Sequence, residues 1–307
     1  MKLPVNPAHP RSNPLAAAGH LALWVGLYAA SWTCIALWMF EVTVSRAAVG
    51  VAFCATIAVY LLDRIKLRNS AVDPADVEAH PARLTFLTHH ALFVRALMIL
   101  FMVAAGVIGW TLTPWLLLIL IAASVGVWLY GSMPRRPRVK DRLIIKNAAV
   151  AVSMTALFTA LAIYADEPNA GSFWPEAWPP TFWSVSLFGA LHIFADAMLC
   201  DLDDAPSDAA YGTDTIVNRV GERRTWVIAI LLSFGGSAIL VVEGMTRSER
   251  VSDPTTLWTL AIGLVIAKLL LGGVRGCIAP RGRWVRDAID LHVPAVVGLA
   301  LVVRSMS

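Results

Sequence analysis

The sequence predicts an all-α membrane protein in which nine helices cross the bilayer. Of its 307 residues, 58% are hydrophobic and only 15% are charged, and the mean hydropathy is +0.67. Soluble domains are about 45–50% apolar and about 25% charged, so this composition excludes a soluble enzyme, and it also excludes a disordered chain. The apolar residues form long uncharged runs, and about 20 such residues can cross the bilayer core as a helix.

Nine of these runs are predicted to be membrane spans. The uncharged stretch 96–132 is too long for one helix, and we divide it at Thr113-Pro114 because proline disfavours a helical conformation in the preceding residue. No repeat or soluble domain interrupts the runs, so residues 1–307 are expected to form one domain with a short cytoplasmic tail, 1–15. The predicted spans are 21–40, 47–62, 91–110, 114–131, 148–165, 181–195, 226–242, 256–274 and 289–303.

The basic residues predict the orientation of these spans, because cytoplasmic loops carry an excess of Lys and Arg. With a cytoplasmic N-terminus, 19 of the 25 Lys and Arg residues fall on the cytoplasmic side and only four on the other. We therefore expect an integral protein of a bacterial inner membrane, with its N-terminus in the cytoplasm and its C-terminus outside. The net charge of +4 then reflects topology, and no nucleic acid is expected as a partner, since such binding needs basic residues on one soluble face.

The acidic residues are concentrated where the sixth span is expected to meet the cytoplasm. Asp201, Asp204 and Asp208 are separated by three and four positions and would share one face of a continuing helix. Carboxylates crowded in this way repel each other unless a cation lies among them, and Mg²⁺ prefers carboxylates together with substrate phosphates. The alternative is a solvated acidic loop, but ionisable residues beside a membrane span indicate function. Seven of the 21 acidic residues lie in this stretch: Asp196, Asp201, Asp203, Asp204, Asp208, Asp214 and Glu222.

A second acidic position, Asp63, ends the second span on the same predicted side of the membrane, and Arg64 follows it. Two acidic helix ends that face each other across basic loops would bind Mg²⁺ and a diphosphate. The metal bridges carboxylate and phosphate, while Lys or Arg neutralises the remaining phosphate charge. Bound in this way, the diphosphate becomes a good leaving group.

The stretch CDLDDAPSDAAYGTDTIVNRVG, residues 200–221, resembles the second aspartate-rich motif of the UbiA superfamily of intramembrane prenyltransferases. Asp201, Asp204 and Asp208 match the three acids of that motif, and Cys200 replaces its usual Asn. The tail of the motif is matched by Gly212, Thr215, Arg219 and Gly221.

The first motif of that family, N-x-x-x-D-R-x-x-D, is only partly present. Asp63 and Arg64 match its centre, whereas Val59 and Leu67 replace its Asn and its last Asp. The run after the fourth span is similar to the family's Tyr-then-Lys segment, with Tyr130 and Lys140 in those places. The chain thus resembles a divergent member of the superfamily.

The resemblance implies a UbiA-like helical bundle that transfers a prenyl group from a prenyl diphosphate to an aromatic or lipid acceptor. The implied Mg²⁺ ligands are Asp63, Asp201, Asp204 and Asp208. The implied catalytic residues are Asp63, Asp204, Asp208 and Tyr130, of which Tyr130 either steadies a carbocation or is an interface-belt tyrosine. The residues expected to bind the substrate are Arg64, Arg138, Lys140 and Arg219.

Two alternatives fit the same resemblance. A membrane terpene cyclase would ionise the same substrate and capture the cation with a double bond of the substrate itself. A non-catalytic or transport protein would keep the fold and lose part of the first motif. A CDP-alcohol phosphotransferase would need D-G-x-x-A-R, which the sequence lacks.

Overall fold

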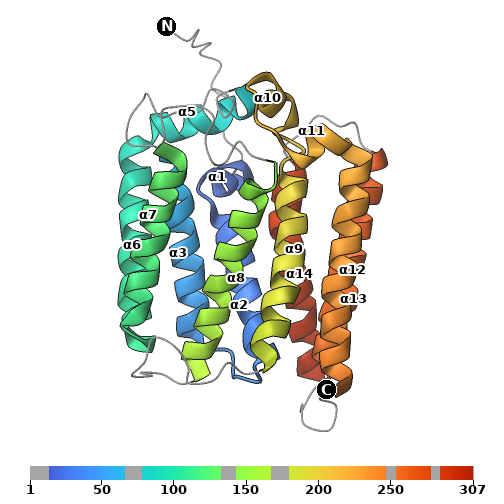
Figure 1. Cartoon of the computed structure of the whole chain (residues 1–307). Helices are drawn as coiled ribbons and strands as arrows, with labels where there is room; N and C mark the ends of the chain where they lie inside the picture. Colours follow the sequence, from blue (N-terminus) through green and yellow to red (C-terminus); the bar gives the residue numbers. More distant parts are fainter. Residues whose placement is uncertain are drawn as a thin grey trace, which may run out of the picture.

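The computed structural model describes residues 14–65, 78–132, 143–166, 180–246, 254–277 and 284–306. All regular structure in these ranges is helical. The long helices run side by side along a common axis (Figure 1). They are α2 (Leu23–Met39), α3 (Arg46–Ile65), α6 (Ala91–Leu112), α7 (Trp115–Ser132), α8 (Ile145–Asp166), α9 (Pro180–Cys200), α12 (Glu222–Thr246), α13 (Pro254–Cys277) and α14 (Trp284–Met306).

Among the described residues, four further helices are short, and they lie at or near one end of the bundle, which is the upper end in Figure 1. The sequence did not predict them, because each is too short to show an apolar period. They are α1 (Pro14–His20), α5 (Pro81–His89), α10 (Ala205–Ala210) and α11 (Ile216–Val220). Together they cover the helix ends that carry the acidic residues.

Each of the nine predicted apolar runs forms a long helix, so the all-helical membrane architecture is confirmed. The exact count of nine spans is not confirmed. Within the described ranges, seven helices are long and apolar enough to cross a membrane, and an eighth is gained if α1 and α2, which are bent by 68°, form one span. Over the part of α7 whose side chains the structure describes, Trp115–Gly126, the helix is apolar, and Thr113-Pro114 separates it from α6 at the expected place.

The core lies where α2, α8 and α9 meet. Trp32 of α2 is fully buried, and its ring centroid lies 5.8 Å from that of Phe158 on α8 and 5.2 Å from that of Phe188 on α9. By contrast, only 11% of α6 is buried, and large apolar side chains such as Leu92 and Leu100 are exposed on it. An apolar helix that exposes such residues is suited to lipid.

A glycine allows α8 and α9 to pack closely. A Cβ atom at Gly189 would overlap the ring of Phe158, which is itself packed against Trp32. At Gly298 of α14, by contrast, nothing lies within 4 Å of the position of a Cβ atom. The two glycines therefore differ in packing although both lie inside long helices.

We predict that Gly189→Ala lowers the stability of the bundle by about 1–3 kcal/mol, because overpacking displaces the Phe158 ring. Gly298→Ala is the matched control, and it should be neutral or stabilising by up to about 1 kcal/mol, since alanine favours a helix over glycine. Thermal unfolding of both purified variants in detergent tests this. Equal melting temperatures for the two variants would contradict the packing described here.

Candidate functional site

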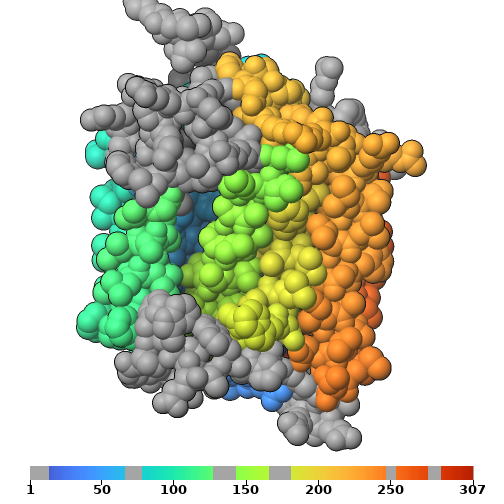
Figure 2. Space-filling model, in the orientation of Figure 1, coloured from blue at the N-terminus to red at the C-terminus, as the bar shows by residue number. Residues whose placement is uncertain are grey.

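A cavity of about 1010 Å³ lies within the bundle and is lined by residues of α2, α3, α5, α7, α8, α9, α10 and α14. Most of its charged lining residues come from the helix ends beside the short helices, whereas many side chains from the middle of the helices, such as Leu120, Met154 and Ile193, are apolar. The space-filling view shows a hollow between α7 and α8, with α3 visible in blue behind it (Figure 2). One cavity therefore combines a charged end with apolar walls.

The acidic stretch does not continue α9 as one straight helix. The helix ends at Cys200, a turn covers residues 201–204, and α10 begins at Ala205 with Pro206 in its first turn. Proline in that position suits a helix start and interrupts the preceding helix. The turn stays compact, since the Asp208 N–H donates to the Asp204 carbonyl at 2.8 Å, and it brings all three predicted acids to the cavity lining.

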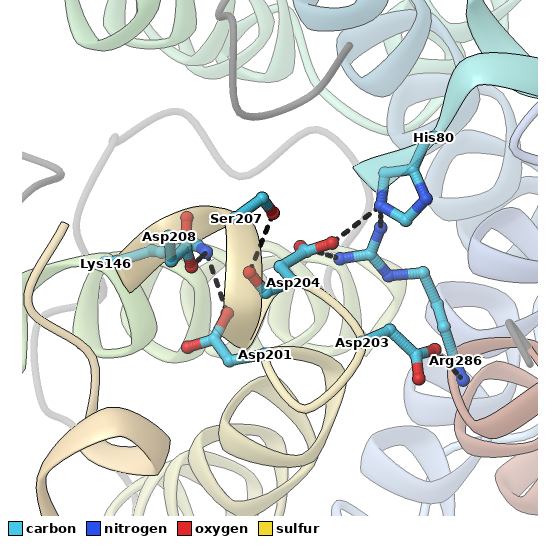
Figure 3. Close-up of polar contacts among 8 residues, drawn as sticks. All are labelled: His80, Lys146, Asp201, Asp203, Asp204, Ser207, Asp208 and Arg286. Atoms are coloured by element: carbon cyan, nitrogen blue, oxygen red, sulfur yellow. Dashed lines mark hydrogen bonds and ion pairs between the residues drawn. The ribbon is translucent and has the colours of Figure 1, made fainter. Parts of the chain in front are cut away.

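Lys146, in the first turn of α8, lies between two of these acids (Figure 3). Its Nζ atom is 2.8 Å from Oδ1 of Asp201 and 3.5 Å from Oδ2 of Asp208. Burial raises the pKa of the Asp208 carboxyl to about 6; Lys146 opposes this rise, and the negative charges of Asp204 and Asp201 add to it. A cation of the chain itself thus separates carboxylates that would otherwise repel each other.

Asp204 has two different partners. Nη2 of Arg286, from α14, donates to its Oδ2 at 2.9 Å, and Nε2 of His80, just before α5, lies 2.6 Å from its Oδ1. Burial acts to raise the pKa of Asp204, but the charge of Arg286 and the hydrogen bond of His80 outweigh it and hold that pKa well below its usual range. Burial also lowers the pKa of His80, so its imidazole is neutral near pH 7. These contacts join α9 and α10 to α14 and α5.

Asp63 and Arg64, predicted from the partial first motif, line the same cavity. The Nη1 atom of Arg64 also donates to the carbonyls of Gly19 and His20, each at 2.9 Å. Arg64 therefore holds the last turn of α1 against α3. Val59, where the family motif has Asn, also lines the cavity.

Arg219 does not lie with the other predicted site residues. It is not among the cavity-lining residues, its side chain is 61% exposed, and its Nη2 atom lies 2.6 Å from Oδ2 of Asp214. Arg138, Lys140 and the side chain of Tyr130 fall outside the part of the chain that the structure describes. The structure therefore brings together Asp63, Arg64 and the three acids of the second motif.

The tail of the second motif has a structural role in this chain. Gly212 and Gly221 have φ angles of 74° and 84°, a region that glycine adopts without the steric cost that other residues meet. Thr215 caps α11, because its side-chain oxygen accepts a hydrogen bond from the N–H of Asn218 at 3.3 Å. These residues shape the turn from α10 through α11 to α12.

Sequence reasoning did not identify His80, Lys146 or Arg286 as site residues. Lys146 and Arg286 were counted only as loop cations that set the topology. The sequence does contain a signal for these two residues. Lys146 and Arg286 are basic residues at the start of apolar helices, and both lie on the predicted cytoplasmic side, where α9 ends. His80 had no such signal, since it precedes a short helix.

The carboxylates suit a divalent metal by their chemistry. Hard cations such as Mg²⁺ take oxygen ligands from carboxylates, and Oδ2 of Asp208 is buried with only a 3.5 Å contact to Lys146. However, within the described residues no three His, Cys, Asp or Glu side chains converge as a ligand set. The donor types fit a metal, while Lys146 and Arg286 provide the counter-charges in this structure.

Comparisons with known proteins agree with this geometry. Residues 85–276, more than half of the chain, match the model of the UbiA prenyltransferase family. The fold is similar to the apo structure of a UbiA homolog from Aeropyrum pernix K1, at 12% identity and a TM-score of 0.61, over 91% of this chain and 98% of that one. It is also similar to a UbiA homolog from Archaeoglobus fulgidus bound to DMAPP and Mg²⁺, at 11% identity and a TM-score of 0.50, over 95% and 98% of the two chains. A search of curated proteins gave no match.

We predict that Lys146→Met lowers stability in the presence of a chelator by about 1–3 kcal/mol, because Asp201 and Asp208 lose their shared partner. Added Mg²⁺ should then raise the melting temperature of the variant more than that of the unmodified protein, since a metal can replace the missing charge. Lys146→Arg, which keeps the charge, is the control. An equal response to Mg²⁺ in Lys146→Met and Lys146→Arg would show that the lysine does not occupy the position of a cation.

Proposed function

The chain belongs to the UbiA prenyltransferase family, and from this membership we propose that it is a Mg²⁺-dependent intramembrane prenyltransferase. It would move a prenyl group from a prenyl diphosphate to a hydrophobic acceptor, aromatic or lipid. The observation that carries the proposal is the single cavity in which carboxylates and cations at one end meet apolar walls within the bundle. An amphiphile with an anionic head and an isoprenoid tail fits both parts.

Four carboxylates would hold Mg²⁺ in this proposal: Asp63, Asp201, Asp204 and Asp208. When bound, the metal would stabilise the negative charge that develops on the departing diphosphate. Lys146, Arg286 and Arg64 are among the cations that line the same cavity and could contact phosphate oxygens. Arg138 and Lys140 are still proposed to bind the substrate, and Tyr130 is still proposed as a catalytic residue. The geometry gives no support to a phosphate contact from Arg219, and Lys146 and Arg286 replace it in the proposal.

The ion pairs of the described structure suggest how ligand binding is balanced electrostatically. Lys146 and Arg286 neutralise the carboxylates when no ligand is bound, and the same side chains can neutralise phosphate when a metal takes the carboxylates. The charge in the site would then stay close to balanced in both states, which matters because an unpaired buried charge is costly. Metal and diphosphate would therefore bind together more readily than either alone.

The apolar walls supply the other requirement of prenyl transfer. Breaking the C–O bond of a prenyl diphosphate gives an allylic cation, which water would capture if it reached the site. Side chains such as Leu120, Val150 and Met154 line the cavity and would exclude water around the isoprenoid tail. The hollow between α7 and α8 (Figure 2) offers a route from the lipid phase. By the distribution of basic residues, the charged end would face the cytoplasm.

Purified protein should be incubated with Mg²⁺ and labelled prenyl diphosphates of several chain lengths, with and without aromatic acceptors. Product that depends on the acceptor supports prenyl transfer. Hydrocarbon or terpenol formed without an acceptor would support the cyclase alternative instead. If the protein neither turns over nor binds any prenyl diphosphate, both enzyme functions are refuted.

We predict that Asp204→Asn and Asp208→Asn each lower the rate of transfer on the order of 100-fold or more, because each removes a charge that holds the metal at the leaving group. Each should also weaken the binding of prenyl diphosphate in Mg²⁺, measured by calorimetry. Asp214→Asn is the matched control from the same acidic stretch, since Asp214 pairs with Arg219 and does not line the cavity. Activity that survives in the first two variants, or is lost equally in the third, would show that the metal assignment is wrong.

A further inference from the structure

A second charged cluster lies inside the bundle, apart from the ion pairs at the helix ends. The carboxylate of Asp196 on α9 and the ammonium group of Lys268 on α13 are 2.8 Å apart, and their side chains are only 4% and 0% exposed. Lys268 also donates to Oγ of Ser233 on α12 at 2.6 Å. Ionisable residues buried within membrane spans are costly and are functional candidates by default.

Tyr28 connects this cluster to the cavity. Its hydroxyl group donates to Oδ2 of Asp196 at 2.7 Å. Tyr28 and Asp196 line the cavity, whereas Lys268 and Ser233 are not among its lining residues. One side of the buried ion pair therefore faces the space in which the substrate is proposed to bind, and the other side is closed by protein.

The hydrogen-bonding state of Tyr28 limits what it can recognise. A phenol has one hydrogen to donate and two lone pairs to accept with, and the hydrogen is committed to Asp196. A ligand group that meets the Tyr28 oxygen in the cavity must therefore be a donor, such as the O–H of a phenol or an alcohol. The carboxylate behind it, with Lys268 as counter-charge, is a place where a proton can be received.

The position of the cluster suits the acceptor rather than the diphosphate. Asp196 lies four positions before the end of α9, and Asp201 is the first residue of the turn that follows, so Asp196 lies on the order of 6 Å further into the bundle than the end of the helix. A prenyl diphosphate held by its phosphates at Asp201 and Asp208 would extend its C1 carbon in this direction.

We propose that Tyr28 and Asp196 form the acceptor site: the Tyr28 oxygen accepts a hydrogen bond from an acceptor hydroxyl, and Asp196 takes up the proton that the acceptor loses. This inference rests on the proposed transferase function. In the step, the C1–O bond to diphosphate breaks, and both of its electrons leave with the diphosphate. The acceptor forms a new bond to C1 with a pair of its own electrons. Its hydroxyl proton passes to the Tyr28 oxygen as the tyrosine proton passes to Oδ2 of Asp196, so atoms and charge balance.

The competing interpretation is that the ion pair only holds the helices together. A buried pair that is purely structural can often be replaced by apolar residues of similar size without loss. The double substitution Asp196→Leu with Lys268→Met removes both charges and leaves neither unpaired. Tyr28→Phe removes one hydroxyl group and keeps both the ring and the ion pair. Ser237→Ala is the control, because Ser237 is a buried hydroxyl that contacts His192 at 3.3 Å and does not line the cavity.

The experiment uses the full-length purified protein in nanodiscs with Mg²⁺ and prenyl diphosphates labelled at C1. Phenols, long-chain alcohols and glycerol phosphates serve as hydroxyl acceptors, and the methyl ethers of the phenols lack the donor. Three quantities are measured: product transferred to the acceptor, diphosphate released without transfer, and binding of prenyl diphosphate. Melting temperatures report whether each variant is folded. The ratio of transfer to release is the quantity that a merely structural role would not change.

We expect Tyr28→Phe and the double variant to bind prenyl diphosphate within about threefold of the unmodified protein. Transfer to hydroxyl acceptors should fall at least 100-fold relative to diphosphate release, while Ser237→Ala keeps its ratio. If the double variant does not fold, Tyr28→Phe alone decides. An unchanged ratio in the folded variants would overturn the proposal. Turnover of prenyl diphosphate by the unmodified protein, with transfer to none of the hydroxyl acceptors, would overturn it and leave the proposed ionisation intact. Absence of both binding and turnover would instead refute the proposed function.

Discussion

The carboxylates of Asp201, Asp204 and Asp208 are buried beside a membrane span, where each negative charge needs a counter-charge close by. Lys146 provides it for Asp201 and Asp208, and Arg286 provides it for Asp204. Because these cations come from α8 and α14, the ion pairs fix how three helices meet. The need to neutralise the buried carboxylates thus determines how the helices meet at this end of the bundle. The cavity is the space that these helices leave between them.

The rest of the bundle is held together by apolar contacts instead of ion pairs. Its helices are apolar on most sides, they pack through residues such as Trp32 and Phe158, and they expose large apolar side chains on α6. Against this background the Asp196–Lys268 pair stands out, since it lies inside the spans and reaches the same cavity through Tyr28. One cavity therefore meets charged groups at two depths, with the deeper one suited to a neutral group that donates a hydrogen bond.

The long helices could be predicted from the sequence, because they depend on local patterns of apolar residues. Each apolar run forms a helix, and Asp63, Asp201, Asp204 and Asp208 share one cavity. Arg219 lies apart from these acids, because the glycine turns and the Thr215 cap shape the segment that follows α10, and Arg219 pairs there with Asp214.

The contacts of His80, Lys146 and Arg286 with the acids could not be predicted from the sequence, because they depend on how distant helices pack. His80 and Arg286 are separated by 206 positions in the chain, and only the packing of helices brings them together at Asp204. Lys268 lies inside the predicted span 256–274, where a charged side chain is costly without a counter-charge. In the structure, the carboxylate of Asp196 supplies this counter-charge.

The central claim is that cations of the chain neutralise the carboxylates until a metal and a diphosphate arrive together. Electron paramagnetic resonance with Mn²⁺ in place of Mg²⁺ tests this most directly, because the signal of free Mn²⁺ falls as the ion binds. The account predicts weak uptake by the protein alone and stoichiometric uptake once a non-reactive prenyl thiolodiphosphate is added. Full uptake without the analogue, or none in its presence, would contradict the account.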